Sequence, residues 1–188
     1  QFIIDNRYSA LFLDMGLGKT VATLTAIQKL KYDYVEIDKT LVIAPKSVAR
    51  NTWTGESHKW DHLRSLGISV VMGTPRQREK ALDEEADIYV INRDNLPWLV
   101  AYCEASIGRW PFDSVVADES SSFKNPQSRR FKALRKVRSQ IRRMVLLTGT
   151  PSPNGLMDLW SQIYLLDGGE RLGHTLSAYR SRYFTPLL

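Results

Sequence analysis

The chain is poor in cysteine and has no long apolar stretch. Cys103 is its single cysteine among 188 residues, so no disulfide can form within the chain. We therefore expect a reducing, intracellular setting, and we interpret Cys103 as a buried structural residue rather than a catalytic thiol. No apolar run approaches the roughly 20 residues of a membrane-spanning helix, so we expect no membrane partner.

The start of the chain and its charge show two further absences. It begins with Gln1 instead of methionine and lacks the basic-then-apolar order of a secretion signal, so we expect a fragment or a chain that has lost residues. An acidic excess is also missing, because 26 Lys and Arg face 20 Asp and Glu, a net charge of +6. A basic balance favours a polyanionic partner without saying which one.

Short apolar segments recur along the chain, separated by helical patterns. The predicted strands are Ala10–Leu13, Leu41–Ala44, Ile68–Val71, Ile88–Ile91, Ser114–Ala117 and Met144–Leu147. The predicted helices are Lys19–Leu30, Ser47–Lys59, Pro75–Asp83, Asp94–Ala105, Ser128–Val137 and Leu156–Leu165. The apolar runs are continuous, which is typical of strands covered on both faces. The alternation predicts an α/β domain with a mainly parallel sheet and helices on both faces.

The segment from Ala10 to Thr20 has the order strand, glycine-containing turn and helix, as in a phosphate-binding loop. The predicted nucleotide-binding residues are Met15, Gly16, Leu17, Gly18, Lys19 and Thr20. Glycines let backbone N–H groups point into one concavity, and the helix N-terminus favours an anion there. We expect Lys19 to reach the β- and γ-phosphates and the Thr20 hydroxyl to bind Mg²⁺. Leu13 replaces the first glycine of the generic pattern, so an ordinary strand–turn–helix joint is the alternative.

Two adjacent carboxylates, Asp118 and Glu119, follow the predicted strand Ser114–Ala117. Because phosphate sites of parallel sheets lie at the carboxyl ends of strands, we expect both near Lys19. We assign Asp118 to hold Mg²⁺, and Glu119 to orient and deprotonate the attacking water. In isolation, the pair also fits a helix cap.

Other strand ends carry polar or basic residues. Lys46 and Ser47 follow the second predicted strand and Arg93 follows the fourth, so all three are candidates for contacts to a phosphate backbone. Candidates for sensing the γ-phosphate follow the last strand: Thr148, Gly149 and Thr150. Each segment also fits an ordinary loop, in which Ser47 would cap the next helix.

Basic and aromatic residues are further candidates for nucleic-acid contacts. The basic residues between Ser128 and Arg143 are Arg129, Arg130, Lys132, Arg135, Lys136, Arg138, Arg142 and Arg143. We interpret them as a solvated helix face docked on the sheet, with a nucleic-acid or partner surface as the alternative. Trp53 and Trp60 lie at helical spacing, and we interpret both as core residues rather than as a base-stacking platform.

Taken in order, these segments resemble the first RecA-like domain of superfamily 2 helicases, and within them the SNF2-like DNA-dependent ATPases. The similar segments are 14–20 (motif I), 44–47 (motif Ia), 118–121 (motif II), 147–151 (motif III), 123–125, 154–160 and 178–186. The resemblance implies a three-layer RecA-like P-loop NTPase fold. It also implies ATP and Mg²⁺ as cofactors, and hydrolysis coupled to translocation on duplex DNA through sequence-independent backbone contacts. Ser121 stands where family members often have His, and no adenine-reading Q motif is visible.

The resemblance further implies that the chain is one part of a motor. It places an ATP-binding domain at residues 1–165 and an extension at 166–188 that leads towards a second RecA-like domain with arginine fingers. Because such a finger contributes about 10³–10⁵ in rate, we expect the chain alone to be nearly inactive. The alternatives are a strand-separating helicase, a non-hydrolysing DNA-binding scaffold, and a kinase-like P-loop enzyme acting on a small molecule.

Overall fold

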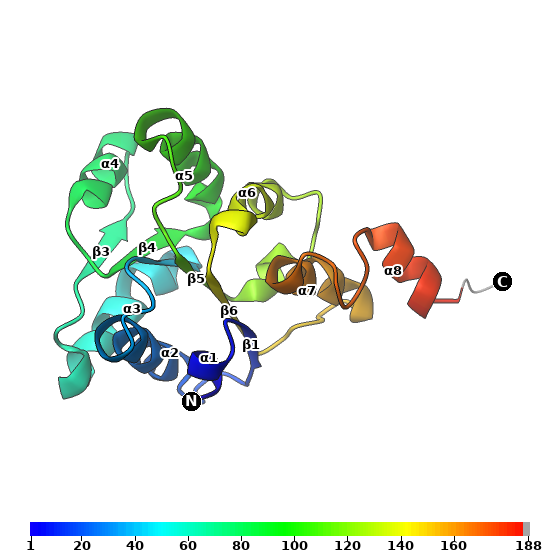
Figure 1. Ribbon diagram of the computed structural model, residues 1–188, viewed down its shortest axis with the longest axis horizontal. Coiled ribbons are helices and arrows are strands. Elements are labelled where there is room, and N and C mark those ends of the chain that lie inside the picture. The colour runs from blue at the N-terminus through cyan, green and yellow to red at the C-terminus, as the bar shows by residue number, and fades with distance from the viewer. Residues whose placement is uncertain (186–188) are drawn as a thin grey trace.

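In the computed structural model, which describes residues 1–185, a six-stranded sheet lies between two layers of helices (Figure 1). The strands are β1 (Tyr8–Phe12), β2 (Thr40–Ala44), β3 (Ile68–Val71), β4 (Ile88–Asn92), β5 (Ser114–Asp118) and β6 (Arg143–Thr148). Their order across the sheet is β1-β6-β5-β2-β4-β3, and all neighbours pair in parallel. The predicted α/β fold class is therefore confirmed.

Helices cover both faces of the sheet. One layer is α1 (Phe2–Asp5), α2 (Lys19–Gln28) and α3 (Lys46–Lys59), which lie together at the bottom of Figure 1. The other layer is α4 (Pro75–Asp83), α5 (Leu96–Tyr102), α6 (Arg129–Val137) and α7 (Leu159–Asp167). This arrangement explains the continuous apolar strands: Leu41 and Ile43 pack with the second layer, whereas Val42 between them packs with the first. All three are fully buried, and burying such a side chain contributes about 1.5–3 kcal/mol.

Several predicted boundaries differ from the structure. β1 begins at Tyr8 rather than Ala10, because Tyr8 pairs with Met144 and its hydroxyl donates to the Ile141 carbonyl oxygen at 2.9 Å. The prediction for Asp94–Ala105 was too long, since regular α-helix is confined to α5, between a 3₁₀ turn at Arg93–Asn95 and a π turn at Cys103–Ile107.

Two expectations for α3 were wrong. Lys46 is already helical and Pro45 is the N-cap, so Ser47 lies inside the first turn and does not cap the helix. Trp60 is 46% exposed at the end of α3, because the chain leaves the helix there and carries this side chain away from the sheet. Trp53, in contrast, is fully buried as predicted.

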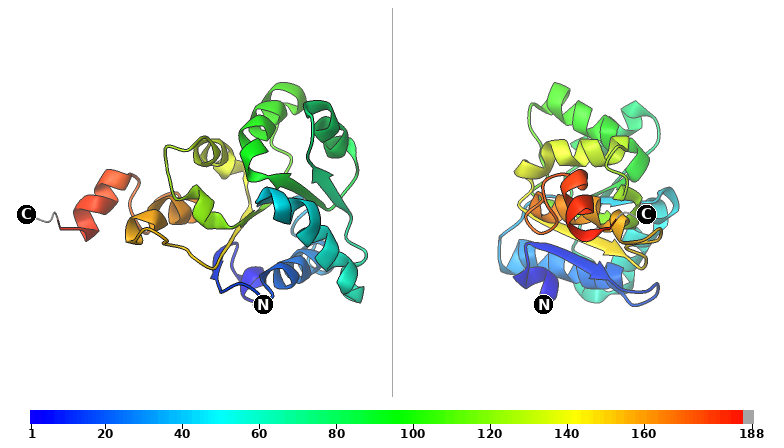
Figure 2. Two further views of the ribbon diagram at one scale, coloured as in Figure 1. Left: turned by 180° about the vertical axis from the view of Figure 1, so that it is seen from behind. Right: turned by 90° about the vertical axis from the view of Figure 1, so that its right-hand side faces the viewer.

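The C-terminal part was not predicted in detail. α7 continues to Asp167, two residues past the expected domain boundary at 165, and α8 (Leu176–Tyr183) follows. In Figure 1 and in the left view of Figure 2, α8 extends beyond the rest of the domain. The end of the expected extension 166–188, including Pro186, lies outside the described residues. Within residues 1–185, no helix is long and apolar enough to cross a membrane.

Candidate active site

The carboxyl ends of β1, β6 and β5 bring three of the sequence motifs to one edge of the sheet. Phe12 at the end of β1 pairs with Thr148 of β6, and Leu147 pairs with Asp118 of β5. The loop after β1 stays beside β6, because the Leu13 N–H donates to the Thr148 carbonyl oxygen at 3.2 Å. The glycine-containing turn, the acidic pair and the turn after β6 are therefore neighbours, as parallel pairing dictates.

The loop between β1 and α2 has the form of an anion cradle. Gly16 and Gly18 have φ angles of 80° and 71°, a left-handed conformation that favours glycine. Met15 is 86% exposed and Leu17 is 61% exposed, so the loop is open to solvent. Gly18 is the N-cap of α2 and makes no side-chain cap, which leaves the first N–H groups of the helix free to bind an anion.

Lys19, the first residue of α2, bends back over this loop. Its Nζ donates to the carbonyl oxygens of Leu13 at 2.7 Å and Asp14 at 2.9 Å. These two neutral acceptors leave the positive charge uncompensated, so a phosphate oxygen can replace either of them. The partly exposed Thr20 follows directly in the first turn of α2. Its hydroxyl and the nearby carboxylates are the hard oxygen ligands that Mg²⁺ prefers.

Asp118 is the most constrained of the predicted site residues. It is 8% exposed, and its Oδ2 accepts a hydrogen bond from the Trp53 indole N–H at 3.0 Å. Its Oδ1 accepts from the Glu119 backbone N–H, also at 3.0 Å. Burial raises the pKa of Asp118, and the Trp53 hydrogen bond and the nearby Lys19 charge only partly oppose that rise. A divalent cation at this carboxylate would lower its pKa again, so the site suits a metal.

Glu119 has a strained backbone at the point where the chain leaves β5. Its φ angle of 52° is unusual for a residue with a side chain. The Thr148 hydroxyl lies 3.4 Å from Glu119 Oε2 and also accepts from the Thr150 N–H at 3.1 Å. The turn after β6 therefore contacts the acidic pair directly. Gly149 packs beside the loop after β1, since a Cβ added there would be in van der Waals contact with the Leu13 carbonyl oxygen at 3.4 Å.

A buried glutamine that the sequence analysis missed joins two of these motifs. Gln162 of α7 accepts from the Ser120 hydroxyl at 2.9 Å and donates to the carbonyl oxygens of Pro151 at 2.6 Å and Asp158 at 3.0 Å. Both Ser120 and Gln162 are fully buried. The available signal was a pair of polar residues, Ser161 and Gln162, within the largely apolar helix α7. For Trp53, the signal was the indole N–H, which needs an acceptor when it is buried.

The three candidates for backbone contacts follow neighbouring strands. Ala44 of β2 pairs with Asn92 of β4, so the loops that carry Lys46 and Arg93 begin side by side. Lys46 and Ser47 are exposed and Arg93 is partly exposed. Arg93 also lines a hollow of about 500 Å³ together with Asp94, Pro97, Trp98, Ser128, Arg129 and Arg130. Two members of the basic cluster therefore join Arg93, which the sequence did not reveal.

One member of that cluster does not belong to a surface. Arg143 is 5% exposed and contacts Glu36 through its Nη2 at 2.6 Å and its Nε at 2.8 Å. It also donates to the carbonyl oxygens of Ile3 at 3.0 Å and Ile4 at 2.9 Å. The interpretation of Arg143 as part of a solvated face was wrong, because it is the first residue of β6 and turns towards α1.

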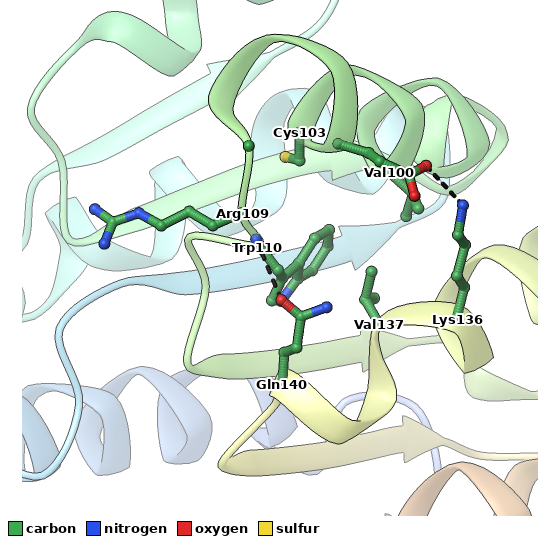
Figure 3. Close-up of a pocket in the computed structure, with 9 residues that line it drawn as sticks. Val100, Cys103, Arg109, Trp110, Lys136, Val137 and Gln140 are labelled. Atoms are coloured by element: carbon green, nitrogen blue, oxygen red, sulfur yellow. Dashed lines mark hydrogen bonds and ion pairs between the residues drawn. The ribbon is translucent and has the colours of Figure 1, made fainter.

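A different hollow of about 360 Å³ lies beside Cys103, at the opposite edge of the sheet (Figure 3). Lys136 at its rim pairs with Glu104 at 2.6 Å, and the Gln140 side-chain oxygen accepts from the backbone N–H of Trp110 at 3.4 Å. Burial raises the pKa of Cys103 to about 12, so its thiol stays protonated and is a poor nucleophile. None of the predicted site residues lines this hollow.

Comparisons with known proteins agree with this geometry. The family model of the SNF2-related domain matches residues 5–184. The chain is 44% identical over 188 residues to "Putative protein p41" of Acyrthosiphon pisum secondary endosymbiont phage 1, a match that covers 97% of this chain and 40% of that protein. It is 31% identical over 166 residues to "ATP-dependent helicase BRM" of Arabidopsis thaliana, covering 87% of this chain and 7% of that protein.

A solved structure gives the same result at the level of the fold. The structure described as "Sulfolobus solfataricus SWI2/SNF2 ATPase core in complex with dsDNA" matches with a TM-score of 0.77 and 29% identity. The match covers 98% of this chain and 36% of that chain, so our chain spans well under half the length of these relatives. The resemblance inferred from the motifs is confirmed: the chain belongs to the family of SNF2-related domains and is an SNF2-type RecA-like ATPase domain.

Proposed function

We propose that this chain is the nucleotide-binding lobe of a DNA-dependent ATPase that couples ATP hydrolysis to translocation on duplex DNA. The observation that carries the proposal is the shared edge of the sheet. Lys19 follows β1 at the start of α2, and Asp118 ends β5, which is separated from β1 by one strand, β6. Lys19 lies close enough to lower the pKa of Asp118 in part. A triphosphate cradle and an acidic metal holder are the two parts that phosphoryl transfer needs first.

Each site residue then has a role in hydrolysis. The backbone of residues 15–18 and the Lys19 ammonium bind the phosphates of ATP. Thr20 and Asp118 would hold Mg²⁺, and the ion would supply positive charge to the phosphate oxygens. Glu119 orients and deprotonates the attacking water. Thr148, through its contact with Glu119, reports the state of the nucleotide to the turn at Gly149 and Thr150.

The DNA-binding part of the proposal rests on position and charge. Lys46, Ser47 and Arg93 bind the phosphate backbone, and Arg129 extends that surface through the hollow it shares with Arg93. Arg130 lines the same hollow but pairs with Asp94 at 3.2 Å. Backbone contacts of this kind fix the position of the protein on DNA and carry no sequence information. The Sulfolobus structure, described as an ATPase core in complex with double-stranded DNA, supports duplex rather than single-stranded DNA as the track.

We also propose that the motor needs a second RecA-like lobe. Residues 1–165 form the ATP-binding part, and residues 166–188 lead towards that lobe, which supplies the arginine finger. The chain alone then turns over ATP very slowly. ATP and DNA are intracellular, which agrees with the expected location.

The test is ATP turnover by the full-length protein without DNA, with single-stranded DNA and with duplex DNA. We expect the strongest stimulation by duplex, together with displacement of a third strand from a triplex and no unwinding of a forked duplex. Unwinding of the fork would favour the strand-separating helicase. An ATP turnover rate that no DNA changes would contradict the proposal and favour an enzyme that acts on a small molecule. DNA binding without turnover would favour the scaffold.

A further inference from the structure

Trp53 connects the metal-holding carboxylate to the helix that begins at the proposed DNA contacts. Its indole is fully buried beneath α3, and its N–H donates to Asp118 Oδ2 at 3.0 Å, across 65 positions of sequence. The other oxygen of Asp118 is bound by the backbone of its own neighbour, Glu119. Trp53 is therefore the side chain from another element that fixes the orientation of this carboxylate.

The segment between the DNA contacts and Trp53 is a continuous piece of helix. Lys46 and Trp53 are seven residues apart in α3, or about 10 Å at 1.5 Å per residue. Ala49 between them is fully buried in the same apolar cluster as Trp53, which fixes this face of the helix on the sheet. Gly55, the one glycine of α3, lies after Trp53 and does not interrupt the segment. A shift of the exposed end of α3 is therefore transmitted to the indole.

We propose that Trp53 is a positioning residue that makes the orientation of Asp118 depend on DNA bound at the start of α3. The proposal rests on the proposed function, because it assigns a route by which DNA stimulates that same ATPase site. Bound DNA fixes Lys46 and Ser47, α3 fixes the indole, and the indole holds Asp118 where it binds Mg²⁺. Partners of this kind, bound to a metal ligand, change metal affinity by about 10–100-fold when they are removed.

The test compares Trp53 of α3 with Trp60, the C-cap of the same helix, in the full-length protein. Trp53→Phe removes the donor, and Trp60→Phe is the matched control, because Trp60 is exposed and its indole lies 3.4 Å from Glu56. A third variant carries benzothienylalanine at position 53, which replaces the N–H by sulfur and keeps the volume of the ring. It separates loss of the hydrogen bond from loss of packing.

The first readout is binding, without turnover. A fluorescent ADP analogue is titrated with Mg²⁺ at each variant. We expect the Mg²⁺ concentration for half-maximal binding to rise about 10-fold in both position-53 variants and to stay unchanged in Trp60→Phe. An unchanged Mg²⁺ requirement in the folded benzothienylalanine variant would overturn the positioning role.

The second readout is the coupling between the binding of Mg²⁺–nucleotide and the binding of duplex DNA. If each ligand changes the affinity for the other, the two effects must be equal. Mg²⁺ with a non-hydrolysable ATP analogue is expected to tighten duplex binding by the wild type, and about 5-fold or more of that effect is expected to disappear in the position-53 variants. Coupling that survives in them would overturn the DNA route. If the wild type itself shows neither coupling nor DNA-stimulated turnover, the proposed function and the DNA route both fail. The Mg²⁺ titration does not depend on DNA, so it still decides the role of Trp53 at Asp118.

Discussion

The two edges of the sheet use charged residues in opposite ways. At the amino edge, Asp87 before β4 binds the Lys31 ammonium at 2.8 Å, the Gly67 N–H at 2.7 Å and the Tyr32 hydroxyl at 3.0 Å. Asp113 before β5 accepts from the backbone N–H groups of Asp38 and Lys39, and its carboxylate also lies 3.9 Å from the Arg142 guanidinium. At the carboxyl edge, the Lys19 ammonium is bound by loop carbonyl oxygens and forms no ion pair among residues 1–185.

This difference separates residues that stabilise the fold from residues kept for a ligand. A charge that is paired within the protein lowers the free energy of the native state, but it cannot bind a ligand without losing that partner. The charges of Lys19, Asp118 and Glu119 are bound by neutral donors and acceptors instead. A phosphate and a divalent cation therefore supply the opposite charges that the site lacks. The predictions below test this division.

The largest effect is expected from Glu119→Gln at the carboxyl edge. Loss of a general base lowers a rate by about 10²–10⁴, so DNA-stimulated turnover by the full-length protein should fall by that factor. Nucleotide affinity and stability should change little, since the amide keeps the shape of the side chain. Glu85→Gln, an exposed position just before β4 at the amino edge, is the control and should leave turnover intact. Equal turnover by wild type and Glu119→Gln would remove the catalytic role of Glu119.

The next prediction concerns Arg143 at the amino edge. Arg143→Met leaves the carbonyl oxygens of Ile3 and Ile4 without their donor, and orphaned acceptors of this kind cost about 1–3 kcal/mol. The lost pair with Glu36 adds less, because the Glu36 side chain is 37% exposed. Urea unfolding should show this loss, with nucleotide affinity unchanged. Arg142→Met is the matched control, because the neighbouring Arg142 side chain is 67% exposed and lies 3.9 Å from Asp113. Similar losses in both variants would contradict the structural role of Arg143.

The same division explains how far the sequence could lead. Continuous apolar strands that alternate with helices predicted the fold class, because burial on both faces leaves no other pattern. The segments around Lys19 and Asp118 could be assigned to one edge, because every parallel strand ends there. Arg143 was misinterpreted since charge in a sequence does not reveal burial. The burial of Trp53 was predicted, but its hydrogen bond to Asp118 was missed, as was that of Gln162 to Ser120, because these bonds join residues far apart in the chain.

Gln162 tests whether the carboxyl edge also contains purely structural polar groups. Gln162→Leu leaves the Ser120 hydroxyl and the Pro151 carbonyl oxygen buried without partners, which should cost about 2 kcal/mol in urea unfolding. Adding Ser120→Ala should restore part of the loss, since one orphaned group is then removed. Gln127→Leu on the surface is the control. Strict additivity of the two buried substitutions would contradict the direct contact.

The smallest effects should come from the pH dependence of two aspartates at opposite edges. At Asp87, burial opposes ionisation, but the bonds from Lys31, Gly67 and Tyr32 outweigh it and lower the pKa. At Asp118, burial dominates and raises the pKa. A lowered native pKa adds stability above the unfolded value of about 3.9, and that stability is lost as pH falls through the native pKa. A raised native pKa makes a contribution of opposite sign, because the ionised carboxylate costs stability at pH values above that native pKa.

Asparagine at each position separates the two signs. Asp87→Asn should lose about 1 kcal/mol at pH 7, because a hydrogen-bonded charge is removed, and the loss should shrink as pH falls through the acid range. Asp118→Asn should be neutral or slightly stabilising at pH 7, and this difference should also vanish in acid. Unfolding free energies measured from pH 3 to 7 decide the matter. If the change in unfolding free energy had the same pH dependence in both variants, the contrast between the two edges would be wrong, because both carboxylates would then stabilise the fold in the same way.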